Sequence, residues 1–156
     1  MAAEADRPYR AGYSISGIGA GRIFAALLDP KSFPEWAVGL GAVSATDADG
    51  RETSEIIPGT TLTFVLSAAG LRHTVTSEVT AVEPPRLLEW RYVGGAVGAG
   101  GWYVEETGFG TVRMTLATDY AVEPAWLNAI AHRPFFRGLT EDLLRRSIRR
   151  FEERLR

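Results

Sequence analysis

The chain combines a long stretch of alternating apolar and polar residues with one amphipathic segment at its end. Between residues 42 and 120 the alternation has a period of two and is interrupted by glycine and proline clusters, which is typical of antiparallel strands joined by turns. Over residues 140–156 the period becomes helical, and one stripe carries Leu144, Ile148, Phe151 and Leu155. One long helix against one curved sheet predicts an α+β fold shaped like a cup.

The individual elements follow from this periodicity and from the turn residues. Strands are predicted over residues 9–18, 42–47, 61–67, 71–82, 87–93, 102–106 and 111–120. Short helices are predicted over 19–28 and 32–36, directly after the first strand, and over 125–130. Pro134 and Gly138 predict a broken first turn in the C-terminal helix, since both residues disfavour a helix interior. The glycine-rich residues 94–101 are predicted to form a flexible hairpin.

Length and composition limit the classes of protein to consider. With 156 residues, the chain is expected to form a single domain over residues 1–156. A net charge of -2 argues against a nucleic-acid partner, and the absence of cysteine excludes disulfides and thiol chemistry. No segment has the length of a membrane span or the order of a signal peptide, so a cytoplasmic location is expected. Lys31 is the only lysine among many arginines, which hints at a GC-rich bacterial genome.

Alternation also predicts which side chains face the inside of the cup. Because the inner faces carry aromatic and aliphatic residues with a few neutral polar groups, they have the composition of a ligand pocket. A filled core whose tyrosine hydroxyls find partners at the rim would look the same, so both interpretations are open at this point. The predicted ligand-contacting residues are Tyr13, Phe64, His73, Val75, Ser77, Trp90, Tyr92, Trp102, Met114, Thr118, Tyr120, Leu144 and Ile148.

His73 is the candidate catalytic residue. Histidine is the side-chain type that exchanges protons near neutral pH, and His73 stands on an otherwise apolar face. The alternative is a structural histidine, satisfied by a neighbouring hydroxyl or placed near a strand end, because no carboxylate shares its face. Glu105 and Glu106 are consecutive, so a strand would turn them to opposite sides. No metal-ligand spacing and no dinucleotide or phosphate-loop fingerprint occurs, so neither a metal nor a cofactor is predicted.

Three segments resemble a known superfamily: FAALLDPKSFPEW at residues 24–36, PGT at 58–60 and VTAVEPPRLLEW at 79–90. Together with the C-terminal helix, they are similar to the START/Bet v 1-like superfamily, also called SRPBCC, and in particular to its bacterial polyketide cyclase/dehydrase and lipid transport branch. The resemblance covers nearly the whole chain. It implies a helix-grip fold, in which a strongly curved antiparallel sheet wraps the long C-terminal helix and two short helices close one end. It also implies an internal cavity for a hydrophobic ligand.

The resulting prediction is a binding protein for a hydrophobic, polyketide-like or polycyclic small molecule, acting as a monomer or homodimer in natural-product biosynthesis or transport. One alternative is a polyketide aromatase/cyclase that uses His73 and cavity hydroxyls. A second alternative is a self-resistance protein that sequesters an enediyne-type antibiotic, or is consumed by it, through backbone glycines of residues 94–101.

Overall fold

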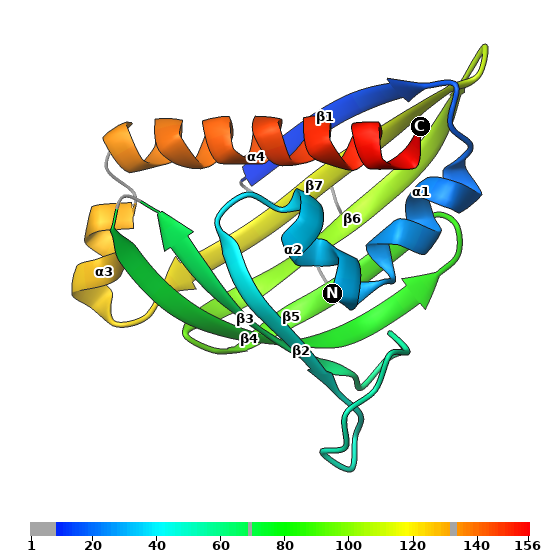
Figure 1. Ribbon diagram of the computed structural model, residues 1–156. Helices are drawn as coiled ribbons and strands as arrows, with labels where there is room; N and C mark the ends of the chain where they lie inside the picture. The colour runs from blue at the N-terminus through cyan, green and yellow to red at the C-terminus, as the bar shows by residue number, and fades with distance from the viewer. Residues whose placement is uncertain (1–8, 69, 132–133) are drawn as a thin grey trace.

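The computed structural model describes residues 9–68, 70–131 and 134–156; for residues 68, 120, 130, 131 and 134–140 it describes the backbone alone. Figure 1 shows a strongly curved sheet with one long helix lying across its concave side. The sheet has seven strands in the order β1-β7-β6-β5-β4-β3-β2, and all neighbours are antiparallel. The strands are β1 (Tyr9–Ser16), β2 (Leu40–Thr46), β3 (Thr61–Ala68), β4 (Leu71–Glu83), β5 (Leu87–Gly94), β6 (Ala96–Gly108) and β7 (Thr111–Val122).

Short helices close the two ends of the sheet, and the long helix spans between them (Figure 1). After β1 come α1 (Ala20–Leu27), the 3-10 turn η2 (Pro30–Ser32) and α2 (Phe33–Trp36). After β7 come α3 (Ala125–Ala131) and α4 (Pro134–Leu155). The predicted helix-grip α+β fold is therefore confirmed, including the two short helices after the first strand and the separate short helix at 125.

Two predicted boundaries were wrong. The glycine-rich residues are not a hairpin, because β6 begins at Ala96 and residues Ala99 to Gly101 pair with both β5 and β7. Only Gly95, with a φ of 75°, lies between β5 and β6. The terminal helix has no broken first turn, since α4 runs without interruption from Pro134. A proline at the first helical position costs no hydrogen bond, because that N–H has no partner within the helix anyway.

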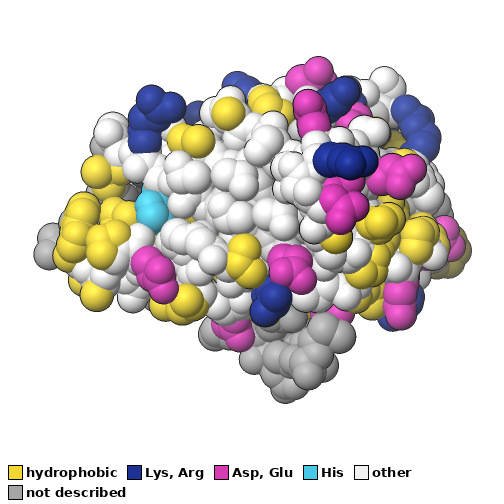
Figure 2. Space-filling model, turned by 90° about the horizontal axis from the view of Figure 1, so that it is seen from below, with side chains coloured by type: hydrophobic (Ala, Val, Ile, Leu, Met, Phe, Trp, Pro, Cys, Tyr) yellow, Lys and Arg dark blue, Asp and Glu magenta, His cyan; other side chains and the backbone are white. Residues whose placement is uncertain are grey.

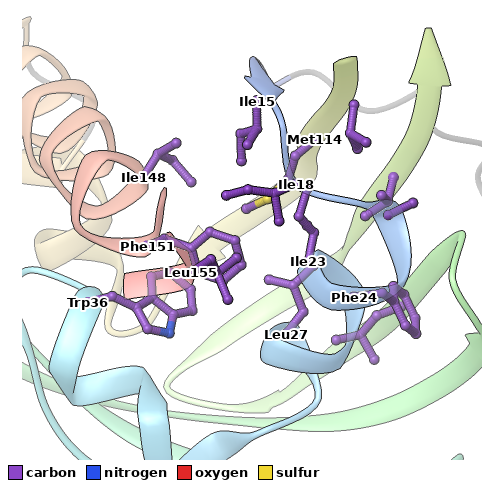
Figure 3. Close-up of a cluster of buried hydrophobic side chains, with 14 of the residues drawn as sticks. Ile15, Ile18, Ile23, Phe24, Leu27, Trp36, Met114, Ile148, Phe151 and Leu155 are labelled. Carbon is purple, nitrogen blue, oxygen red and sulfur yellow. The ribbon is translucent and has the colours of Figure 1, made fainter. Parts of the chain in front are cut away.

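The hydrophobic core lies where α1, α2 and the C-terminal half of α4 meet one end of the sheet. Ile23, Leu27 and Phe151 are at most 1% exposed. Figure 3 shows side chains of α1, α2 and α4 converging there with Ile15 of β1 and Met114 of β7. The predicted stripe on α4 is confirmed, since Ile148, Phe151 and Leu155 are buried and Leu144 packs against them. This core fills one end of the cup only.

The outer side of the sheet faces solvent. Figure 2 shows this side, where Lys or Arg and Asp or Glu side chains are interspersed and hydrophobic side chains gather towards the two ends. Glu89 is an exception among the outward residues, because it is only 6% exposed. The hydroxyl of Tyr103 donates a hydrogen bond to its Oε2 over 2.6 Å. The Tyr103 ring can pack flat against this part of the sheet because Gly101 has no side chain to clash with it.

Candidate ligand cavity

A cavity of about 390 Å³ lies between the concave face of the sheet, α2 and α4. Leu66 belongs to its wall and is 41% exposed, so the cavity reaches the surface near the end of β3. None of the described lining residues carries a charge. They are Leu27, Phe33, Trp36, Ala37, Val38, Gly39, Leu40, Leu62, Phe64, Leu66, Ser67, Ser77, Leu88, Trp90, Tyr92, Trp102, Leu116, Thr118, Leu143, Leu144 and Ser147.

The floor of the cavity is built by the side chains that alternation turns inward on β3 to β7. Trp90 lies flat on the sheet because the facing residue of β6 is Gly100. A Cβ at Gly100 would lie 2.9 Å from two carbons of the Trp90 ring and 2.9 Å from Thr118 Oγ1. The missing side chain therefore shapes the floor as much as the aromatic ring does.

The closed end of the cavity is formed by the aromatic pair of α2. Phe33 and Trp36 meet edge to face, with ring centroids 5.6 Å apart and an interplanar angle of 72°. Trp36 also meets Phe151 of α4 edge to face at 4.8 Å and 70°. Such arrangements are the favourable ones for aromatic rings, so Trp36 joins its own helix α2 to α4, which is distant in sequence.

A short hydrogen-bond chain crosses the floor. Thr118 Oγ1 donates to the carbonyl of Ala99 over 3.1 Å, so it accepts from the Tyr92 hydroxyl, which lies 3.1 Å away. At the opposite wall, Ser147 Oγ donates to the Leu143 carbonyl over 2.7 Å and accepts from the Val38 N–H over 2.8 Å. These hydroxyls fix the cavity wall and donate their protons to the protein itself.

The structure brings together part of the predicted ligand-contacting set. The members that line the cavity are Phe64, Ser77, Trp90, Tyr92, Trp102, Thr118 and Leu144. Met114 and Ile148 lie in the hydrophobic core instead, and Val75 is buried without reaching the cavity. The side chain of Tyr120 lies outside the described residues.

His73 does not line the cavity. It is half-buried on β4, and its Nε2 lies 2.6 Å from the carbonyl oxygen of Gly95. The same oxygen accepts the N–H of Glu123 over 3.0 Å. Because a carbonyl only accepts, Nε2 must carry a proton in this contact. His73 thus ties β4 to the turn between β5 and β6, which is the structural alternative anticipated for a histidine near a strand end.

Tyr13 also lies outside the cavity wall, half-buried against the hydrophobic core. Burial raises the pKa of its hydroxyl above the ordinary value of 10.0. The charge of Arg145 lowers this pKa and that of Glu141 raises it, but burial is the largest effect. Tyr13 therefore keeps its proton across the physiological range.

Sequence reasoning missed the lining residues contributed by helices and connections. It also left out four lining residues on the strands, although they lie on the predicted inner faces: Leu62, Leu66, Leu88 and Leu116. The spacing of Phe33 and Trp36 was an available signal, since residues three apart share one side of a helical turn. No comparable pattern marks Val38 to Leu40 or Ser147, which reach the cavity through tertiary packing alone.

The described residues contain no group of three or more His, Asp or Glu side chains placed to hold a metal ion. Among the helices in the described part of the chain, none is long and apolar enough to cross a membrane.

A curved antiparallel sheet that grips a C-terminal helix around an internal cavity defines the START/Bet v 1-like class of proteins. Within it, the chain belongs to the family described as polyketide cyclase/dehydrase and lipid transport, whose model matches residues 15–156. No curated protein sequence matches the chain.

Several solved structures share the fold at low sequence identity. A Thermus thermophilus protein is 15% identical with a TM-score of 0.73, and the match covers 94% of both chains. The Zhui aromatase/cyclase of a Streptomyces species is 12% identical with a TM-score of 0.70, covering 94% of this chain and 93% of that one. A START superfamily protein of Mycobacterium smegmatis is 14% identical with a TM-score of 0.67, covering 94% and 95%. At these identities the likeness concerns the fold.

Proposed function

We propose that the protein binds a hydrophobic, polyketide-like or polycyclic small molecule in this cavity, in natural-product biosynthesis or transport. The observation that carries the proposal is the cavity itself: about 390 Å³, lined by aromatic and aliphatic side chains with a few hydroxyls and no charge among the described residues. Pockets for small molecules have this size and composition. The family description, which names both polyketide cyclases and lipid transport, supports the same class of ligand.

Binding is favoured over turnover by the chemistry of the wall. General acid–base catalysis needs a group that exchanges protons near the working pH. Of the described lining residues only Tyr92 has an ionisable side chain, and its hydroxyl is engaged with Thr118. Aromatase/cyclase activity remains the second candidate, because the family includes cyclases and because the Tyr92–Thr118 pair places two hydroxyls against any bound ligand. The self-resistance alternative gains no support, since its predicted flexible hairpin is strand.

Tryptophan fluorescence tests the binding proposal. Trp36, Trp90 and Trp102 line the cavity, whereas Trp126 is 63% exposed on α3. Titration with anthraquinone, a flat polycycle, should quench emission saturably in a Trp126→Phe background, which removes the external reporter. Trp90→Ala should weaken binding while the circular dichroism spectrum is retained. A linear response without saturation for this and for anilinonaphthalene sulfonate would contradict the proposal.

A poly-β-ketone substrate separates carrier from cyclase. If the protein is a cyclase, Tyr92→Phe should lower product formation with little loss of affinity, because a transition-state interaction is removed while most contact area stays. His73→Ala should leave ligand affinity unchanged and lower stability, since it cuts the link to Gly95. Product formation that depends on His73 but not on Tyr92 would return His73 to the role of catalytic residue.

A further inference from the structure

Ser77 places a hydroxyl group in the floor of the cavity that pairs with no other group of the described chain. The residue is 3% exposed, and its Oγ has no hydrogen-bond partner among the described residues. The atom is nevertheless accessible, because within the described ranges the indole nitrogen of Trp36 is the one side-chain polar atom that is both unpartnered and enclosed. Since Ser77 is a lining residue, the space that its hydroxyl reaches is the cavity. A buried hydroxyl without a partner costs free energy, so the partner that it requires is one that enters the cavity.

The strand register holds Ser77 in the middle of the sheet. It stands on β4 between its cross-strand partners Leu62 of β3 and Tyr92 of β5, which also line the cavity. The Tyr92 side chain leans away from Ser77, because its hydroxyl bonds to Thr118 of β7, two strands further on. Leu66, the wall residue near the surface, is four positions from Leu62 on β3, which is about 13 Å along the strand. The free hydroxyl therefore faces the interior of the cavity rather than its mouth.

The other hydroxyl groups of the wall differ from that of Ser77. Thr118 and Ser147 donate to backbone carbonyls, and Tyr92 donates to Thr118. Ser67 is exposed, so solvent hydrates its hydroxyl whether or not the cavity is filled. Among the described lining residues, Ser77 thus carries the one hydroxyl that is buried from solvent and not engaged by the protein.

A serine hydroxyl is also more versatile than the indole groups of the wall. Trp90 and Trp102 line the cavity and are half-buried, but an indole N–H can only donate. The hydroxyl of Ser77 both donates and accepts, so it pairs with a carbonyl or with a hydroxyl group of a ligand. Water that hydrates it in the free protein must leave when a ligand fills the cavity. A ligand that does not replace the lost hydrogen bond then binds more weakly.

We infer that Ser77 is a specificity-determining residue whose hydroxyl forms a hydrogen bond with a carbonyl or hydroxyl oxygen on the buried part of the ligand. This inference rests on the proposed function and narrows it to hydrophobic molecules that carry an oxygen remote from the cavity mouth. A hydrocarbon of the same shape would leave the hydroxyl buried and unpaired, so the site discriminates against it.

Fluorenone and fluorene make a matched pair of probes, because they share a flat tricyclic skeleton and differ by one carbonyl oxygen. Their affinities are measured by displacement of anilinonaphthalene sulfonate from the wild-type protein, from Ser77→Ala and from Ser44→Ala. Ser44 is the matched control, since it is exposed on β2 and does not line the cavity. The ratio of fluorenone to fluorene affinity should be about threefold to tenfold higher in wild type and Ser44→Ala than in Ser77→Ala. The intrinsic difference in hydrophobicity between the probes cancels in this comparison.

The carbonyl stretching band of bound fluorenone reports the contact directly in infrared spectra. A hydrogen bond lowers its frequency, so the band of the wild-type complex should lie below that of fluorenone in hexane. Ser77→Ala should move the band back towards the hexane position. In urea denaturation without ligand, Ser77→Ala should be at least as stable as wild type, because the substitution removes no described hydrogen bond.

Several outcomes would overturn the inference and leave the cavity proposal intact. They are an equal affinity ratio in wild type and Ser77→Ala, a wild-type carbonyl band at the hexane position, and a loss of stability in Ser77→Ala, which would show that the hydroxyl serves the fold. A ratio that depends on Ser67 instead of Ser77 would place the ligand oxygen at the mouth and would overturn it as well. Failure of the dye and both probes to bind at all would overturn the proposed function itself.

Discussion

At the scale of single residues, the shape of the cavity depends on side chains that are missing as much as on those present. Trp90 can lie on the sheet only because Gly100 stands opposite it. A run of glycines within a sequence usually indicates a loop, since glycine weakens strands through its conformational entropy. Here the run is strand because flat aromatic rings cover two of its glycines, Trp90 on Gly100 and Tyr103 on Gly101.

Gly100→Ala should therefore be destabilising and should also weaken ligand binding. The added methyl would meet the Trp90 ring at 2.9 Å and force it off the floor of the cavity, at a cost of about 1–3 kcal/mol in the free energy of unfolding. Gly21→Ala is the matched control, because a Cβ there meets nothing within 4 Å and alanine favours helix α1 by up to about 1 kcal/mol. Urea denaturation measures the change in stability, and titration with the dye anilinonaphthalene sulfonate measures the change in binding. Equal stability of the two variants would contradict this account of the floor.

Tyr13 provides a prediction about pH. Burial raises its pKa in the folded protein above 10.0, so the folded chain keeps this proton at pH values where the unfolded chain has lost it. The stabilisation that protonated Tyr13 adds to the fold is complete below about pH 10. It is lost as the pH rises further, because the unfolded chain loses this proton first and deprotonation then favours unfolding. Tyr13→Phe should reduce the decline in unfolding free energy between about pH 9 and about pH 11, measured by denaturation at each pH. An identical decline in both proteins would show that Tyr13 is not perturbed by burial.

At the scale of elements, the sequence predicts well what local periodicity determines. The inner faces of β3, β5 and β7 are confirmed, since a strand must turn alternate residues to opposite sides. The start of α4 was missed because a proline signals a helix end or a helix beginning according to its position, which sequence alone does not reveal. The start of β6 was missed because the packing that stabilises its glycines comes from other strands.

One aromatic contact should contribute strongly to the packing of helix α4 against α2. Phe151 is 1% exposed and meets Trp36 edge to face, so it joins α4 to α2. Phe151→Ala should lower the free energy of unfolding by about 3–5 kcal/mol, because it opens a cavity in the core. Its neighbour Arg150 is exposed, and Arg150→Ala should change stability by no more than about 0.5 kcal/mol. Similar midpoints for the two variants in chemical denaturation would argue against a strong contribution of this contact.

At the scale of the whole molecule, the site is a property of packing between distant segments. Leu27, Leu62 and Leu143 belong to three parts of the chain and meet only around the cavity. Periodicity assigns a residue to an inner face, but it does not reveal whether the space before that face is filled. Met114 and Ile148 show this limit, because they share the inner pattern and yet lie in solid core. The volume that remains open is decided by how closely α2 and α4 approach the sheet.

The open cavity lacks the packing contacts that side chains would make in a filled core, so a larger side chain that fills it should stabilise the fold. Leu116 lines the cavity from β7, opposite Trp102 of β6, and is only half-buried. Leu116→Trp should therefore retain or raise the free energy of unfolding, by up to about 2 kcal/mol, because the larger ring gains contacts without displacing the core. The same variant should bind the dye about tenfold or more weakly, since ring and ligand compete for one volume. Leu116→Met conserves volume and should bind normally. Undiminished binding by Leu116→Trp, together with a loss of stability, would mean that ligands are held elsewhere and that Leu116 faces packed core.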